Sequence, residues 1–165
     1  GLVARECERF GMPLMAEMIP IKSERISNPY SAEAIGLAAR VGAELGADII
    51  KTYYTGSKET FSEVVRRCPA PIVVAGGPKM EAEEQALKVV RESIDGGAAG
   101  VVFGRNIWQH ENPEGMTRAV SRIVHEGLSV EEALKEIAKS KRCGLWKVAP
   151  NTYISPTANL LSRQR

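Results

Sequence analysis

Four short apolar runs alternate with stretches of helical periodicity along this sequence, and this alternation restricts the possible folds more than any other feature. The runs are residues 13–20, 47–54, 71–75 and 98–103, and each is bounded by glycine or proline. Apolar residues recur three or four positions apart in the segments that follow them. Repeated β-then-α units form parallel sheets, so the sequence predicts an α/β fold.

The runs are apolar at successive positions, which is typical of strands in a parallel sheet that helices cover on both faces. Residues 13–20 are therefore expected to form a short buried strand. An open doubly wound sheet and a (β/α)8 barrel both fit this pattern. Because a barrel normally needs about 250 residues, a chain of 165 residues would hold about half of one.

Helix starts are marked by residues that satisfy free backbone N–H groups. Ser31 and Ser57 are predicted N-caps, and Pro113 suits the first turn of a helix. Ser129 and Glu132 have the spacing of a capping box. These signals predict helix starts after three of the four runs, and a last helix that starts near residue 130.

Composition narrows the functional classes. The net charge is only +2, so neither nucleic acid nor an anionic membrane surface is an expected partner. No apolar run approaches the roughly 20 residues of a membrane span. The three cysteines, Cys7, Cys68 and Cys143, lack the spacing of a disulfide framework or zinc site. We expect a cytoplasmic protein that needs no metal or other cofactor.

A lysine lies in the middle of the second run. Side chains alternate across a strand, so Lys51 shares one face with Ile49 and Tyr53. Burying its ammonium costs several kcal/mol unless the group is paired or loses its proton, and an uncharged lysine is a nucleophile. Lys51 is therefore either a reactive amine or a lysine that reaches water from the end of a strand.

Glycines follow the third and fourth runs. Gly76 and Gly77 come directly after residues 71–75, and Gly104 and Arg105 come after residues 98–103. Glycines let backbone N–H groups approach an anion closely, and an arginine adds a charge-assisted hydrogen bond. Ligands of parallel β/α proteins bind at the carboxyl ends of the strands, where Lys51 also lies. The pattern predicts a phosphate site beside the lysine, although Gly-Gly also forms plain turns.

Three segments, residues 46–56, 68–79 and 100–109, resemble the archaeal-type class I fructose-bisphosphate aldolases. They read GADIIKTYYTG, CPAPIVVAGGPK and GVVFGRNIWQ. That group, within the deoxyribose-phosphate aldolase-like superfamily, includes 2-amino-3,7-dideoxy-threo-hept-6-ulosonate synthases and autoinducer-2 phosphate thiolases. The resemblance implies a (β/α)8 TIM barrel whose C-terminal half, strands five to eight, is residues 1–140, followed by an extended arm over 141–165.

The same resemblance implies roles for individual residues. Lys51 would be the Schiff-base lysine of a metal-independent lyase. The residues implied to bind the substrate phosphate are Ala75, Gly76, Gly77, Gly104 and Arg105.

The resemblance fails at one position. Family members carry Tyr-Pro-Arg-Gly after strand five, with the tyrosine transferring protons, whereas residues 19–22 read Ile-Pro-Ile-Lys. Glu17 is on the strand face of Ile19 and is the alternative catalytic acid/base, or else an ion-pair partner for a neighbouring strand. Tyr53 and Tyr54 are further candidates, or packing residues.

Three functions follow from these residues. The first is a Schiff-base aldolase or transaldolase that acts on a phosphorylated ketose such as fructose 1,6-bisphosphate. The second is an autoinducer-2 phosphate-type thiolase, and the third is a non-catalytic phosphate-binding half barrel. Half a barrel would leave two unpaired sheet edges and an uncovered apolar face, so we expect a homo-oligomer. The arm would either contact a neighbouring subunit or be disordered.

Overall fold

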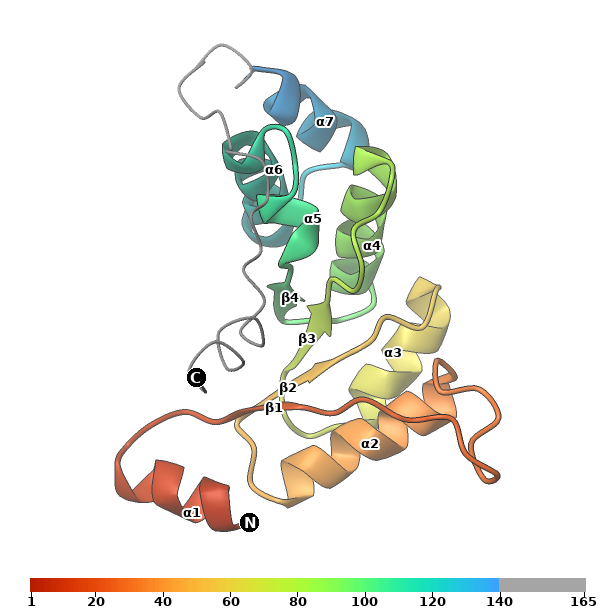
Figure 1. The fold of residues 1–165 in the computed structure, drawn as a ribbon, viewed down its shortest axis with the longest axis vertical. Coiled ribbons are helices and arrows are strands. Elements are labelled where there is room, and N and C mark those ends of the chain that lie inside the picture. The colour runs from red at the N-terminus through yellow and green to blue at the C-terminus, as the bar shows by residue number, and fades with distance from the viewer. Residues whose placement is uncertain (140–165) are drawn as a thin grey trace, which may run out of the picture.

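The computed structural model describes residues 1–139 as a four-stranded sheet with helices around it (Figure 1). The predicted arm over 141–165 lies outside the described residues. In chain order the elements are α1 (Leu2–Arg9), β1 (Met15–Glu17), α2 (Ala32–Glu44), β2 (Ile49–Thr52), α3 (Lys58–Arg67), β3 (Ile72–Ala75), α4 (Glu83–Asp95), β4 (Gly100–Val102), α5 (Arg105–Trp108), α6 (Pro113–Glu126) and α7 (Val130–Lys139).

The four strands are parallel and lie in the order β1-β2-β3-β4, which confirms the predicted α/β class. Each predicted run contains one strand. The register aligns Glu17 of β1 with Lys51 of β2, Lys51 with Val73 of β3, and Val73 with Gly100 of β4. These residues form one row across the sheet, and their side chains project from the same face.

One face of the sheet is buried under helices α2 and α3. Ile50, Ile72 and Val74 are at most 1% exposed and pack against Ile35 of α2 and Phe61 of α3. Figure 1 shows these two helices side by side at one end of the molecule. This cluster, centred on β2 and β3, is called the sheet cluster below.

The opposite face is not buried within residues 1–139. An uncovered face is what we expected of half a barrel, whereas helices over both faces, which the apolar runs alone predicted, are not found in this part of the chain. Lys51, Val73 and Ala75 on that face are each half-buried. The prediction of a buried first strand is also wrong, since Met15 and Glu17 of β1 are exposed. The reason is that β1 is an edge strand, and the four strands do not close around the face that Lys51 occupies.

A second core lies between helices α4, α6 and α7, at the other end of the molecule in Figure 1. Leu87, Met116, Ile123 and Ile137 are at most 1% exposed there. Phe103 and Ile107, which follow β4, pack against the same residues. This core is called the helix cluster below.

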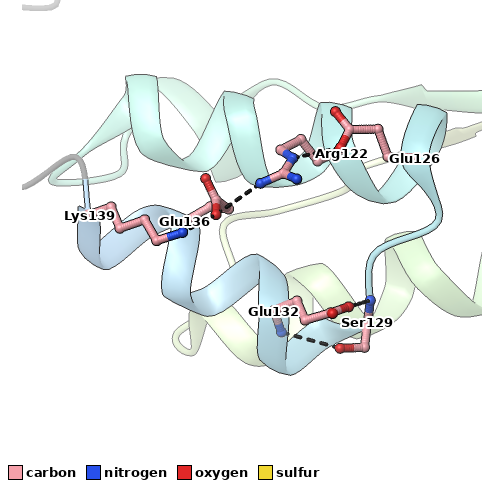
Figure 2. A network of polar contacts seen from close by, with 6 residues as sticks. All are labelled: Arg122, Glu126, Ser129, Glu132, Glu136 and Lys139. Carbon is pink, nitrogen blue, oxygen red and sulfur yellow. Dashed lines mark hydrogen bonds and ion pairs between the residues drawn. The ribbon is translucent and has the colours of Figure 1, made fainter.

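The predicted caps are confirmed. Ser31 Oγ accepts a hydrogen bond from the Ala34 N–H, and Ser57 Oγ accepts one from the Thr60 N–H. Ser129 and Glu132 form the reciprocal bonds of a capping box at the start of α7, drawn in Figure 2. No helix among the described residues is long and apolar enough to cross a membrane.

Candidate active site

The lysine and both glycine turns lie at one edge of the sheet. Lys51 is the penultimate residue of β2, the Gly76-Gly77 turn follows β3, and Gly104 follows β4 by one residue. Since all four strands are parallel, these three positions share the carboxyl edge, where ligands of β/α proteins bind. The topology therefore brings together the residues that the sequence singled out.

Lys51 projects from the face that helices α2 and α3 leave uncovered. Its side chain is 23% exposed, and its Nζ lies 2.9 Å from Oε1 of Glu17, its register partner on β1. Glu17 is 54% exposed. The carboxylate is thus both an ion-pair partner from the neighbouring strand and a proton acceptor within hydrogen-bond distance of the amine, which leaves both interpretations of Glu17 compatible with its position.

Thr52 fixes the end of β1 beside the lysine, and sequence reasoning did not identify it. Its side chain is fully buried, and its hydroxyl donates to the Met18 carbonyl at 2.8 Å. The Met18 N–H in turn donates to the Lys51 carbonyl at 2.8 Å. Pairing between the strands therefore continues one residue beyond Glu17, which holds that carboxylate next to Lys51.

The two tyrosines after β2 have different environments. The Tyr53 ring packs on Tyr30, with 5.1 Å between ring centroids. The Tyr54 hydroxyl donates to Oε2 of Glu92 in α4 at 2.9 Å, and its ring packs on Phe61. Burial and the adjacent Glu92 carboxylate raise the pKa of Tyr54 well above its usual range. Tyr54 is thus a packing residue on the helix-covered side, with a phenol that holds its proton.

The first glycine turn requires glycine at two positions for different reasons. A Cβ on Gly76 would lie 2.8 Å from the Phe103 ring, so only glycine fits between β3 and the segment after β4. Gly77 has φ +63°, which favours glycine, and nothing lies within 4 Å of where its Cβ would be. The side of Gly77 to which a Cβ would point is consequently open at the carboxyl edge.

The second glycine turn opens a short helix that the sequence pattern did not predict. Gly104 is the N-cap of α5, and Arg105 is its first residue. Arg105 is exposed and forms no ion pair with another residue of the 1–139 region. An exposed guanidinium at this position can donate charge-assisted hydrogen bonds to a ligand anion near the turn.

Asn106 links the two turns and is the main residue that sequence reasoning missed. Its side chain is buried, with 4% of the residue exposed. Its Nδ2 donates to the carbonyls of Gly76 at 2.8 Å and Pro78 at 3.2 Å, and its Oδ1 accepts from the Met80 N–H at 2.8 Å. An asparagine directly after a Gly-Arg pair at a strand end was the available signal, but its partners lie 26 to 30 residues away.

Two further contacts join the same segments. Lys79 Nζ donates to the Gln109 carbonyl at 2.8 Å, and His110 Nε2 lies 2.8 Å from Glu83 Oε1. The His110 ring is oriented by its Nδ1, which accepts from the Asn112 N–H, so Nε2 is the donor to Glu83. Across residues 1–139 no three His, Cys, Asp or Glu side chains gather as metal ligands would.

Fold and geometry together define a parallel β/α protein with a lysine and two glycine turns at the carboxyl edge of its sheet. Residues 1–110 match the model of the DeoC/LacD family aldolases. The chain therefore belongs to the DeoC/LacD aldolase family, as its resemblance to class I aldolases led us to expect.

Three similar proteins indicate which members of this family the chain resembles. It is 35% identical over 131 residues to an uncharacterized aldolase of Saccharolobus solfataricus, covering 79% of this chain and 48% of that protein. It is 38% identical over 123 residues to the 2-amino-4,5-dihydroxy-6-oxo-7-(phosphonooxy)heptanoate synthase of Streptomyces griseus, covering 74% and 44%.

The third is a solved archaeal fructose-1,6-bisphosphate aldolase whose catalytic lysine is covalently bound to the carbinolamine intermediate of the substrate. Its TM-score is 0.71 at 35% identity, covering 74% of this chain and 49% of that one. The chain thus spans about half the length of the relatives it matches.

Proposed function

We propose that this chain carries the lysine and phosphate-binding half of a Schiff-base aldolase that acts on a phosphorylated ketose such as fructose 1,6-bisphosphate. One observation supports this most strongly: Lys51 stands on the uncovered face of the sheet, at the edge it shares with both glycine turns. The solved aldolase with a lysine-bound carbinolamine supports a covalent role for a lysine in this family.

In the proposed reaction the uncharged amine of Lys51 attacks the ketone carbon of the substrate. The carbinolamine that forms loses water to give a protonated imine. A base then takes the proton of the hydroxyl on the carbon beyond the bond to be broken, that carbon–carbon bond cleaves, and its electron pair moves to the imine nitrogen as an enamine. Protonation of the enamine carbon and hydrolysis of the imine release the second product and free Lys51.

Glu17 is the proposed acid/base, because its Oε1 lies 2.9 Å from the nitrogen on which the carbinolamine forms. A carboxylate at that distance can receive and return the protons that the addition and dehydration steps exchange. Its 54% exposure leaves room for a substrate hydroxyl to replace the ion pair. This assignment takes the place of the tyrosine that family members carry where this chain has Ile19.

The phosphate of the substrate is proposed to bind Ala75, Gly76, Gly77, Gly104 and Arg105. The open space around Gly77 and the exposed guanidinium of Arg105 support this position. Both lie at the carboxyl edge that Lys51 occupies, so a single ligand can reach the amine with one end and the turns with the other.

We further propose that residues 1–140 correspond to strands five to eight of an eight-stranded barrel. The half-buried face that carries Lys51, and a match to about half the length of each relative, support this arrangement. Completing the barrel requires four more strands, from further sequence or from another polypeptide. The unpaired sheet edges and the uncovered face also support the proposal of a homo-oligomer, which mass measurement by light scattering tests.

Borohydride trapping tests the proposed function. The protein is incubated with fructose 1,6-bisphosphate and sodium borohydride, which reduces a protonated imine to a stable amine, and the modified peptide is identified by mass spectrometry. We expect one adduct, on Lys51. An adduct on Lys58 or another lysine, or no adduct, contradicts the aldolase proposal, and the last result favours a non-catalytic phosphate-binding half barrel.

The acyl-transferring thiolase stays the second candidate, because the position of the proton-transferring tyrosine is occupied by Ile19. An acyl acceptor thiol separates the two proposals. Turnover of a phosphorylated diketone that requires coenzyme A would identify a thiolase, whereas turnover of a ketose phosphate without it identifies an aldolase.

A further inference from the structure

Asn106 determines the shape of the turn after β3. The last main-chain hydrogen bond between this turn and β4 in the described residues is the one from the Gly76 N–H to the Val102 carbonyl, at 3.2 Å. Beyond it, the chain from Gly76 to Met80 wraps around the Asn106 carboxamide. Both N–H groups of that amide and its oxygen are used, so three hydrogen bonds to one buried side chain define the turn.

One of these bonds sets the direction of a backbone donor. The Gly76 carbonyl and the Gly77 N–H belong to the same peptide group, and in a trans peptide they point in opposite directions. Because Asn106 holds the Gly76 carbonyl on its own side, the Gly77 N–H points to the other side. Gly77 is half-buried, no atom lies within 4 Å of where its Cβ would be, and its N–H makes no hydrogen bond within residues 1–139.

The other polar side-chain contacts between these segments act further from this peptide. Lys79 Nζ reaches the Gln109 carbonyl from an exposed side chain, and Glu83 pairs with His110 at the start of α4. Neither touches the Gly76–Gly77 peptide. A buried amide with every bond satisfied holds a loop more rigidly than an exposed lysine does.

We propose that Asn106 is a positioning residue that aims the Gly77 N–H at an oxyanion of a phosphorylated ligand. It acts through the turn and does not touch the ligand itself. The inference rests on the proposed phosphate site, and it explains why an amide stands at position 106: a carboxylate or a hydroxyl cannot donate to two carbonyls and accept from a third group at once.

The probe is inorganic phosphate, and the readout is the amide resonance of Gly77 in an NMR titration of the whole chain. We expect saturable movement of this resonance in the unchanged protein. In Asn106→Leu and Asn106→Asp the dissociation constant should rise at least about tenfold, because the turn loses the bonds that orient it. The neutral leucine variant separates this effect from the charge that aspartate adds.

Asn112→Asp is the matched control. Asn112 also donates from its amide to a backbone carbonyl, that of Ile137 at 3.0 Å, and its oxygen caps α6 through the Gly115 N–H. The same chemical change there removes the donor and adds the same charge without touching either glycine turn. Phosphate affinity should stay within about twofold of the unchanged protein.

Two results would overturn the inference: a Gly77 resonance that does not respond to phosphate, and an affinity that Asn106→Leu and Asn112→Asp reduce equally. Should both Asn106 variants fail to fold, the response of Gly77 in the unchanged protein still decides whether this N–H meets an anion. Borohydride trapping on Lys51 is independent of this measurement. A Gly77 response without a Lys51 adduct would contradict the aldolase reaction and leave the positioning role intact.

Discussion

The two ends of the proposed site belong to different parts of the molecule and are held in different ways. Lys51 lies on β2, on the face opposite the sheet cluster, and one ion pair to the 54% exposed Glu17 holds its amine. The glycine turns border the helix cluster, where the 4% exposed Asn106 makes three hydrogen bonds. The glycine turns, which are the proposed phosphate end, are therefore held by more buried hydrogen bonds than the amine end.

This difference suits the chemistry expected at each end. The Lys51–Glu17 pair is open to water on its Glu17 side, and ion pairs in contact with water contribute about 0–1 kcal/mol, so in the proposed mechanism Lys51 would leave Glu17 at little cost. Donors that face an anion serve best when they are fixed in advance, because they then need no reorganisation when the ligand arrives. Fixed turns and an amine that can leave its ion pair would suit the proposed covalent mechanism on a phosphorylated substrate.

The largest expected effect is at the amine. Lys51→Arg keeps a positive charge beside Glu17 but removes the nucleophile, since a guanidinium stays protonated. Aldol cleavage should fall on the order of a thousandfold or more, and borohydride should trap no adduct, while phosphate affinity is retained. Steady-state kinetics and trapping measure both.

Lys88→Arg is the control for that substitution. Lys88 is 66% exposed and pairs with Glu92 on the surface of α4. Cleavage should be unchanged there. Retention of activity in Lys51→Arg would place the reactive nitrogen elsewhere and remove the proposed difference between the two ends.

Glu17→Gln should have the next largest effect. The amide keeps the shape of the side chain and its contact with Lys51 but cannot accept a proton. If Glu17 is the acid/base, kcat falls by about 10²–10⁴ with little change in KM. A kcat within about twofold of the unchanged protein would reduce Glu17 to an ion-pair partner, and the thermal midpoint distinguishes lost chemistry from lost stability.

Alanine substitutions at Gly76 and Gly77 compare two adjacent positions of the turn after β3. Gly76→Ala forces a methyl group against Phe103 and should lower the free energy of unfolding by about 1–3 kcal/mol. Gly77→Ala meets no neighbour and carries only the cost of a left-handed backbone, about 1–2 kcal/mol. Urea unfolding measures both.

A second substitution tests the cause of the Gly76 effect. Adding Phe103→Leu should relieve part of the loss in Gly76→Ala and none of the loss in Gly77→Ala. Equal behaviour of the two glycine variants would mean that Phe103 does not constrain the turn.

The smallest expected effect is on stability. It concerns Glu136 of the helix cluster, the buried residue of the network in Figure 2. The ion pair with Lys139 lowers the pKa of Glu136 below its usual range against the opposing effect of burial, and Arg122 lowers it further. A lowered pKa means that Glu136 stabilises the fold above about pH 4.5 and that this contribution is lost as the pH falls through the lowered value.

Glu136→Gln should therefore lower the thermal midpoint at pH 7 by a few degrees at most, and the difference from the unchanged protein should shrink under acid conditions. Differential scanning calorimetry across pH 3 to 7 measures it. A difference that stays constant with pH would show that the charge of Glu136 does not help to hold α7 on α6.

The sequence was informative where local patterns determine structure. The four strands lie inside the four apolar runs, and hydroxyl groups at residues 31, 57 and 129 cap the predicted helices. The shared edge of Lys51 and the glycine turns followed from parallel topology alone.

What could not be predicted depends on contacts between distant residues. Thr52 and Met18 are 34 positions apart, and Asn106 and Gly76 are 30 apart, so no local pattern reveals either bond. Helix α5 has only four residues, too few to show a period. The apolar runs predicted helices over both faces because such a run looks the same whether one side or both are covered, whereas the uncovered face was expected from the resemblance to half a barrel.

The row of residues across the sheet sets the room available to a ligand. From β1 to β4 it reads Glu17, Lys51, Val73 and Gly100, so side-chain bulk decreases steadily from the amine toward the second turn. Adjacent strands are about 4.8 Å apart, which puts β4 roughly 10 Å from β2. Gly100 itself is buried, and a Cβ there would lie 3.8 Å from Val73 Cγ1. Under the proposed mechanism a carbon skeleton tethered at Lys51 would therefore extend over Val73 toward the glycine turns.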